Sequence, residues 1–284
     1  MKLLRFETTG KATLGLLKDN AIVEIPASAG FPSMLDIIAQ GDAALSALRD
    51  IEASASPTHK LDDVRLLAPL ERPGKYLAIG MNYKKHIEEA NKLGVETPKR
   101  QFWFNKQTSC ISGPYDDIHT GVSEQVDYEV ELGVVIGARA KHVSAADARK
   151  HIFGYVVAND VSARDWQFHS PTFTLGKSFD THGPIGPWIV TADEIADCHN
   201  LDLRCFVNGE ERQNSNTSNM IYNVYEQIEY LSTAFTLDAG DLIASGTPEG
   251  VGVGMDPQVF LNDGDVVRCE IDGIGAIESK VVRP

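Results

Sequence analysis

The chain has 284 residues, of which 43% are hydrophobic and 23% charged, a composition that supports a packed globular core. Its 40 acidic residues against 26 lysines and arginines give a formal net charge of −14, which argues against a protein that binds the phosphates of nucleic acid. A small anionic substrate remains compatible with this charge, because a few buried cations and a metal ion can reverse the field locally.

The cysteines and the N-terminus indicate a soluble, cytoplasmic protein. The four cysteines form no CxxC pair, so we expect reduced thiols rather than disulfides or structural zinc. The first residues become polar too early for the apolar core of a signal peptide. No apolar run approaches the roughly 20 residues that a membrane-spanning helix needs, so we expect neither a membrane nor a nucleic acid as a partner.

Residues 1–70 are predicted to form a small N-terminal α+β domain. Short apolar runs divided by turn residues indicate strands, and apolar residues at helical spacing follow Pro32. The stretch 68–74 has the composition of a linker. Because no candidate catalytic cluster lies before this linker, we expect residues 1–70 to be a cap or a dimer element.

Residues 71–284 are predicted to be a strand-rich catalytic domain with isolated helices. The expected strands and helices are at 76–79 (strand), 82–92 (helix, with Asn82 as N-cap), 126–136 (strand), 154–158 (strand) and 220–235 (helix). Asn208-Gly209 predicts a two-residue hairpin, and short strands are expected after Asp241. No βαβ rhythm repeats, which favours an α+β fold with a large mixed or antiparallel sheet.

The predicted helix at 82–92 carries His86 and Glu89, which are three residues apart and can touch. A histidine oriented by a carboxylate can act as a general base for a water molecule. A surface His–Glu pair on a charged helix is the commoner explanation of such a spacing. The local sequence does not decide between the two.

The strand pattern at 126–136 places Glu129 and Glu131 on one face, because side chains two residues apart in a strand point the same way. In an apolar strand, such a pair needs either a cation or contact with water. A solvated face explains this segment equally well, but Asp160 ends the strand at 154–158 and would join the pair if the two strands are neighbours. A site made only of oxygen ligands suits Mg²⁺ or Mn²⁺.

Four polar side chains lie near these carboxylates in the sequence. Lys106 and Lys177 are lone lysines beside apolar residues, which indicates either side chains lying along apolar surface or cations that face an anionic substrate group. Arg164 and Gln167 closely follow Asp160 and can point into the same space.

Residues 245–254 form a glycine-rich loop after an apolar strand. The loop lacks the lysine of a phosphate-binding P-loop and does not begin an apolar helix, so nucleotide binding is not expected. Its backbone N–H groups can hold a carboxylate, and a purely structural turn is the alternative.

Taken in order, these segments resemble the fumarylacetoacetate hydrolase family, in particular its shorter members with a small N-terminal domain. The motifs are AIGMNYKKHIEEA (78–90), FNKQTSCISGPYDDI (104–118), VDYEVELGVVIG (126–137), GYVVANDVSARDWQ (154–167), LGKSFDTHGPIGPW (175–188) and SGTPEGVGVG (245–254). The resemblance implies a mixed β-sandwich roll of that type and, commonly, a homodimer.

The resemblance also implies roles for individual residues. The residues that would bind the metal are Glu129, Glu131 and Asp160. The catalytic residues would be the water-activating pair His86 and Glu89, and Lys177. The residues that would bind the substrate are Lys106, Arg164, Gln167 and Thr247. Two positions mark this chain: Ile79, where long members carry a fourth carboxylate, and His182, where many members carry Phe.

The predicted reaction is metal-dependent hydrolysis of the carbon–carbon bond of a 2,4-dioxo acid. The substrate would be an acylpyruvate from aromatic catabolism, such as fumarylpyruvate or maleylpyruvate, and the products pyruvate and an acid. One Mg²⁺ or Mn²⁺ would chelate the 2-oxo acid, and His86 would activate the water. Oxaloacetate decarboxylase, 2-oxo acid isomerase and ureidoglycolate lyase remain alternatives on the same site, as does a catalytically idle metal-stabilised dimer. Residues 168–174 are either a lid that orders on binding or a fixed loop.

Overall fold

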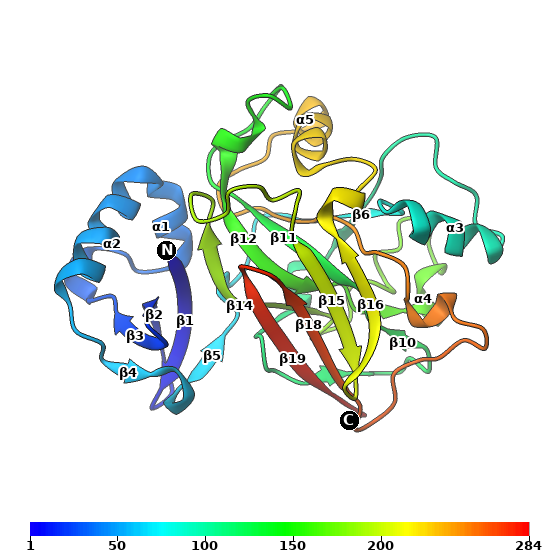
Figure 1. The fold of residues 1–284 in the computed structure, drawn as a ribbon, viewed down its shortest axis with the longest axis horizontal. Helices are drawn as coiled ribbons and strands as arrows, with labels where there is room; N and C mark the ends of the chain where they lie inside the picture. Colours follow the sequence, from blue (N-terminus) through cyan, green and yellow to red (C-terminus); the bar gives the residue numbers. More distant parts are fainter. Residues whose placement is uncertain (284) are drawn as a thin grey trace.

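The computed structural model describes residues 1–283 and confirms the predicted mixed α+β fold, with many strands and few helices (Figure 1). The largest sheet has twelve strands: β1 (Lys2–Thr8), β2 (Lys11–Lys18), β3 (Ala21–Glu24), β4 (His59–Lys60), β5 (Arg65–Leu67), β6 (Tyr76–Gly80), β7 (Phe102–Lys106), β8 (Ile111–Ser112), β11 (Val130–Ile136), β12 (Ile152–Asn159), β14 (Gly183–Thr191) and β17 (Leu242–Ala244).

A second sheet packs against the middle of the first. Its five strands are β9 (Ile118–His119), β15 (Asp202–Val207), β16 (Glu210–Asn216), β18 (Val266–Ile271) and β19 (Gly275–Val282). A two-stranded ladder joins β10 (Val126–Asp127) to β13 (Ser162–Ala163). The helices are α1 (Met34–Gln40), α2 (Asp42–Ser54), α3 (Lys84–Lys92), α4 (Arg164–Gln167) and α5 (Val224–Ala234).

The central strands β11 and β12 are buried on both faces, because two separate cores cover them. Leu132 and Val157 pack in the core shared with β15 and β18 of the second sheet. Val135 and Val156 point the other way, into the core shared with α1 and α2. The period-2 alternation of a strand therefore distributes one apolar sequence over two layers.

Residues 1–70 continue the large sheet rather than packing as a separate layer. Strand β1 pairs with β14, with Lys2 opposite Val190 and Leu3 opposite Ile189. In Figure 1 the N-terminal helices and strands extend this sheet on the side away from α3 and α4. The predicted boundary near residue 70 thus falls between two parts that share a sheet and a core.

The predicted strand at 126–136 is interrupted between Asp127 and Val130. Three consecutive backbone N–H groups there donate to side chains: Tyr128 to Asp127 Oδ1 (2.9 Å), Glu129 to Asn159 Oδ1 (3.0 Å) and Val130 to Gln213 Oε1 (3.0 Å). These side chains replace a neighbouring strand as hydrogen-bond acceptors. The ladder therefore stops next to Glu129, at the edge of the site described below.

The prediction of Asn82 as a helix N-cap is wrong, since α3 begins at Lys84 after Tyr83. The Asn82 side chain instead donates to the carbonyl oxygens of Tyr222 (3.0 Å) and Ser245 (2.8 Å). It also accepts from the Tyr222 N–H (2.9 Å). Tertiary partners thus take the amide that a local cap would have used.

Two local predictions in the second half are confirmed. Asn208 and Gly209 both have positive φ, 53° and 81°, as the turn of the β15–β16 hairpin requires. The expected helix at 220–235 is α5, which starts later because Asn223 caps it with a capping box to Glu226. None of the helices within residues 1–283 is long and apolar enough to cross a membrane.

Candidate functional site

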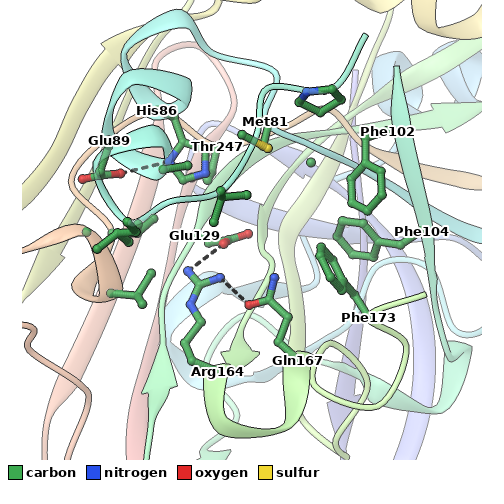
Figure 2. Close-up of a pocket in the computed structure, with 18 of the residues that line it drawn as sticks. Met81, His86, Glu89, Phe102, Phe104, Glu129, Arg164, Gln167, Phe173 and Thr247 are labelled. Atoms are coloured by element: carbon green, nitrogen blue, oxygen red, sulfur yellow. Dashed lines mark hydrogen bonds and ion pairs between the residues drawn. The ribbon is translucent and has the colours of Figure 1, made fainter. Parts of the chain in front are cut away.

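A cavity of about 830 Å³ opens between α3, α4, the ends of β6, β7 and β11, and the loop at 245–254 (Figure 2). Eight of the ten predicted site residues line it: His86, Glu89, Glu129, Glu131, Arg164, Gln167, Lys177 and Thr247. The other two, Lys106 and Asp160, are buried directly behind Lys177 and contact it. The structure therefore brings all ten into one region.

The antiparallel pairing of β11 with β12 brings the three predicted metal ligands together. Val130 lies opposite Asn159, and the Asp160 N–H donates to the carbonyl oxygen of Glu129 (2.9 Å). Carboxylate oxygens of Glu129, Glu131 and Asp160 all lie within 4.8 Å of one another, and all three side chains are buried. The neighbouring strands on which this prediction depended are thus present.

Three buried cations surround the carboxylates. Lys177 Nζ donates to Glu129 (2.6 Å) and to Asp160 (2.9 Å). Lys106 Nζ donates to Asp160 (2.6 Å) and also to the carbonyl oxygen of Lys177. Arg164 Nη2 lies 2.8 Å from Glu129. These are therefore cations paired with buried charges rather than side chains lying along apolar surface.

Asp127 is a fourth buried carboxylate, which the sequence analysis did not assign to the site. It accepts from Arg164 Nε (2.9 Å) and from the N–H groups of Gly252 (2.8 Å) and Val253 (3.0 Å). Four carboxylates therefore face three cations, and the cluster keeps one uncompensated negative charge. The available signal in the sequence was an acidic residue between Val126 and Tyr128, two positions before Glu129.

Glu131 is the carboxyl group of the cluster that has no cationic partner among the residues that the structure describes. Burial alone would raise the pKa of Glu129, but Lys177 and Arg164 lower it to about 2. Burial, followed by repulsion from Asp160 and Glu129, raises the pKa of Glu131 well above its ordinary value. Within residues 1–283 Glu131 forms no ion pair and accepts one hydrogen bond, from Gly246 N (2.8 Å).

These residues fit a divalent cation. The ligand set offers only oxygen atoms, lies next to an open cavity and includes one carboxyl group, Glu131, that no basic side chain of residues 1–283 pairs with. Each carboxylate oxygen can accept more than one interaction, so the lysine contacts are compatible with metal ligation. Mg²⁺ and Mn²⁺ prefer such ligands and keep positions for water or substrate.

His86 and Glu89 do not form a surface pair, because both side chains are about 85% buried and line the cavity. His86 Nδ1 lies 2.9 Å from Glu89 Oε2, and Glu89 Oε1 accepts from Gly250 N (3.1 Å). An ionised carboxylate only accepts, so it holds the imidazole hydrogen on Nδ1 and leaves the Nε2 lone pair for a group in the cavity. This arrangement suits proton exchange.

The glycine-rich loop holds carboxylates of the protein itself. Its N–H groups at Gly246, Gly250 and Gly252 donate to Glu131, Glu89 and Asp127 respectively. At Gly254 the backbone passes so close to Glu89 that an added methyl group would overlap the carboxylate. The loop is therefore more than a plain turn, because its backbone supports carboxylates of the candidate metal site and of the His–Glu pair.

Arg164 and Gln167 form one end of the cavity on α4. Arg164 Nη1 donates to Gln167 Oε1 (3.0 Å), which orients the amide so that its NH₂ group remains available (Figure 2). Thr247 lines the cavity, but its hydroxyl donates to the carbonyl oxygen of Val130 (2.9 Å) and accepts from Gln213 (2.9 Å). Substrate binding by the Thr247 hydroxyl therefore stays a prediction. No pattern in the sequence predicts that Gln213 belongs to the site.

His182 does not line the cavity. Its ring is fully buried and stacks on Phe179, and Nε2 lies 2.9 Å from the carbonyl oxygen of His119. Burial lowers its pKa to about 3. The position thus contributes to packing behind the site.

Comparisons with known proteins identify the family of the chain. The family model "Fumarylacetoacetate (FAA) hydrolase C-terminal" matches residues 75–282, and the model "Rv2993c-like, N-terminal" matches residues 1–69. The chain is 45% identical over 291 residues to oxaloacetate tautomerase FAHD2A, mitochondrial, of Bos taurus, covering 99% of this chain and 92% of that protein.

Two solved structures share the fold over the whole chain. A putative HpcE protein from Mycobacterium smegmatis has a TM-score of 0.90 and 33% identity, covering 100% of this chain and 99% of that one. Maleylpyruvate hydrolase from Sphingobium sp. SYK-6, in complex with manganese (II) ion and pyruvate, has a TM-score of 0.85 and 31% identity, with the same coverage. The names of these relatives include a tautomerase and a hydrolase, so they do not confirm the predicted hydrolysis.

Replacement of Glu131 tests the metal site. Saturating Mg²⁺ or Mn²⁺ should raise the Tm of the wild-type chain, because a ligand that binds only the folded state at 100 times its Kd adds about 2.7 kcal/mol. Glu131→Gln should leave the Tm of the metal-free protein at or above the wild-type value, because Glu131 has no ionic partner within residues 1–283 to lose, and should weaken metal binding by at least about tenfold. Calorimetric titration and thermal unfolding with and without chelator measure both effects. Exposed Glu211→Gln is the control, and a wild-type metal response in Glu131→Gln would exclude Glu131 as a ligand.

Acid unfolding tests the buried neutral His182. Because its folded pKa of about 3 lies below the ordinary 6.5, the unfolded chain binds a proton that the folded chain does not. Stability present above pH 6.5 should therefore be lost as the pH falls, by about 1.4 kcal/mol per unit for this one group. Urea unfolding between pH 7.5 and 4.5 should show a shallower loss for His182→Phe than for the wild type. Exposed His142→Gln should follow the wild type, and equal slopes for His182→Phe and wild type would contradict the assignment.

Proposed function

The chain belongs to the fumarylacetoacetate hydrolase family, and we propose that it catalyses metal-dependent interconversion of the enol and keto forms of oxaloacetate. The observation that carries the proposal is His86, a proton-exchanging group whose Nε2 faces a cavity bordered by buried cations. The whole-length likeness to a protein named oxaloacetate tautomerase supports the choice of reaction. The proposal takes up the isomerase alternative of the sequence analysis rather than its first choice, hydrolysis.

The charge cluster is suited to a 2-oxo acid. A divalent cation held by Glu129, Glu131 and Asp160 would supply Lewis-acid stabilisation of negative charge on the 2-oxo oxygen. Burial alone would lower the pKa of Lys177, but Asp160 and Glu129 raise it, so the ammonium stays charged. Lys177 therefore offers a fixed positive charge to an enolate in the cavity.

Proton exchange is assigned to the His86–Glu89 pair. In the keto-to-enol direction His86 Nε2 takes the proton from C3, the oxygen on C2 gains a proton from solvent, and the imidazolium then releases its proton to solvent. In the reverse direction His86 returns a proton to C3 and the enol O–H proton leaves to solvent. Glu89 holds Nδ1 and stabilises the imidazolium while the proton is on the ring.

Arg164 and Gln167 are assigned to the second carboxylate of the substrate. The amide NH₂ of Gln167 is oriented by Arg164 and is free to donate into the cavity. The guanidinium is held in place by Asp127 and Glu129, so the pair is preorganised before the substrate arrives.

Hydrolysis of an acylpyruvate is a second candidate, because the same His86 Nε2 can take a proton from water. The likeness to maleylpyruvate hydrolase over the whole chain supports it. Decarboxylation and ureidoglycolate lyase activity stay predictions, as do the homodimer and the cytoplasmic location; the Bos taurus relative is named as mitochondrial.

Replacement of His86 tests the proposal. With Mg²⁺ or Mn²⁺ the purified chain should accelerate loss of the enol absorbance of oxaloacetate, and a chelator should abolish the acceleration. His86→Ala should lose about 10²–10⁴-fold in kcat while metal affinity stays unchanged, since only the proton-exchanging group is removed. The exposed Lys85→Ala should keep wild-type rates. If the wild type does not accelerate tautomerisation but releases pyruvate from maleylpyruvate, the hydrolase candidate replaces this proposal.

The support given to Glu89 by the glycine-rich loop has its own test. Gly254→Ala places a methyl group against the Glu89 carboxylate and should displace it from His86. We expect kcat to fall by about 10–100-fold with little change in KM, because a small misplacement of a catalytic pair is costly. Metal affinity by calorimetry should remain at the wild-type value. A Gly254→Ala variant with normal kcat would show that this close approach does not position Glu89.

A further inference from the structure

One wall of the cavity is aromatic and has no role in the reaction proposed above. Phe102, Phe104 and Phe173, here called the aromatic wall, lie across the cavity from His86 and Glu89 (Figure 2). The ring centroid of Phe173 is 5.1 Å from that of Phe102 and 6.1 Å from that of Phe104. The backs of these rings pack on the core of the large sheet, while their cavity sides remain open.

Phe173 adopts a backbone conformation that is unfavourable for its residue type. Its φ of 60° is left-handed, a region that bulky side chains rarely occupy outside functional sites. Hydrogen bonds from its N–H to Ser170 (3.2 Å) and from the Lys177 N–H to its carbonyl oxygen (3.1 Å) hold it there. The same turn therefore positions both the Phe173 ring in the wall and the backbone of Lys177.

The aromatic wall directly borders the charge cluster. Lys177 Nζ, which pairs with Glu129, lies 5.1 Å from the centre of the Phe104 ring. A 2-oxo acid whose head group is held at the carboxylate cluster would therefore place the substituent on its C3 beside the wall. A four-carbon diacid leaves most of a cavity of about 830 Å³ unfilled, and a carboxylate gains nothing from the negative faces of aromatic rings.

We propose that the aromatic wall is a specificity subsite for an apolar substituent, and that the chain takes 2-oxo acids carrying an aryl or branched alkyl group on C3. The inference rests on the proposed function for the reaction at the cluster. Phe173 is the specificity-determining residue, because it contacts both other rings and is held in place by the turn to Lys177. Oxaloacetate uses the Arg164–Gln167 end of the cavity, and the apolar substrates use the wall.

Binding of unreactive analogues tests the subsite without turnover. Oxamate and N-phenyloxamate share the head group of a 2-oxo acid, and only the second carries a ring. Titration calorimetry of the Mg²⁺-loaded chain should give a Kd at least about tenfold lower for N-phenyloxamate, because the ring leaves water for the wall. Equal affinities for the two analogues would overturn the proposal.

Variants of the wall localise the effect. Phe173→Gly removes the ring and tolerates the left-handed backbone, and Phe102→Leu reduces the wall at a second point. Both should lose most of the preference for N-phenyloxamate while oxamate affinity changes by less than about threefold. Phe235→Ala truncates an exposed phenylalanine outside the cavity and is the matched control. A preference that persists in both wall variants would overturn the assignment.

Turnover separates this proposal from the function on which it rests. The wild type should tautomerise both phenylpyruvate and oxaloacetate, and Phe173→Gly should lower kcat/KM for phenylpyruvate by about tenfold or more with a smaller effect on oxaloacetate. Turnover of oxaloacetate without turnover of phenylpyruvate would contradict the proposal of an apolar subsite and leave the proposed function intact. Tight N-phenyloxamate binding without turnover of either acid would support the subsite and sink the proposed function.

Discussion

Crowding of negative charge is the constraint on which the site depends. Glu129, Glu131 and Asp160 place carboxylate oxygens within 4.8 Å of one another in the interior, where like charges are costly. Two buried lysines reduce this cost: Lys177 pairs with Glu129 and Asp160, and Lys106 also pairs with Asp160. In the described part of the chain Glu131 is left without an ionic partner, and a divalent cation bound at the cluster would supply one. The protein thus stores a local instability that ligand binding relieves.

The loop at 245–254 connects this carboxylate cluster to the His86–Glu89 pair through backbone hydrogen bonds. The N–H groups of three glycines in the loop, at 246, 250 and 252, donate to Glu131 on β11, Glu89 on α3 and Asp127 at the end of β10. The three carboxylates come from segments far apart in the sequence, so the loop is the element that sets their relative positions. Glycine is needed because the backbone passes within contact distance of these side chains, as at Gly254. The supporting shell of the site is therefore made largely of backbone.

The sequence was informative where function follows a local period. The two-residue spacing of Glu129 and Glu131 and the three-residue spacing of His86 and Glu89 each fix a shared face, and the structure brings each pair together. Roles that depend on distant partners were not readable. Asn82 was predicted to cap a helix, but its amide binds Tyr222 and Ser245. Gln213 lies in a polar strand, where nothing in the sequence predicts its contact with Thr247. The break in the predicted strand at 126–136 has the same origin, because side chains from distant segments accept its N–H groups.

Whether such a site exchanges a proton at carbon or hydrolyses a bond depends on which atom lies next to His86 Nε2. If C3 of the substrate is there, the imidazole exchanges its proton; if a water beside a distal carbonyl is there, the same imidazole activates that water. The catalytic residues are identical in the two cases, so they cannot by themselves determine the reaction. What differs is whether the bound substrate places its C3 or a water molecule beside a distal carbonyl next to Nε2. On this view the identity of the substrate, and not a change of catalytic residues, would decide the reaction, which is compatible with the full-length likeness of this chain both to a protein named as a tautomerase and to one named as a hydrolase.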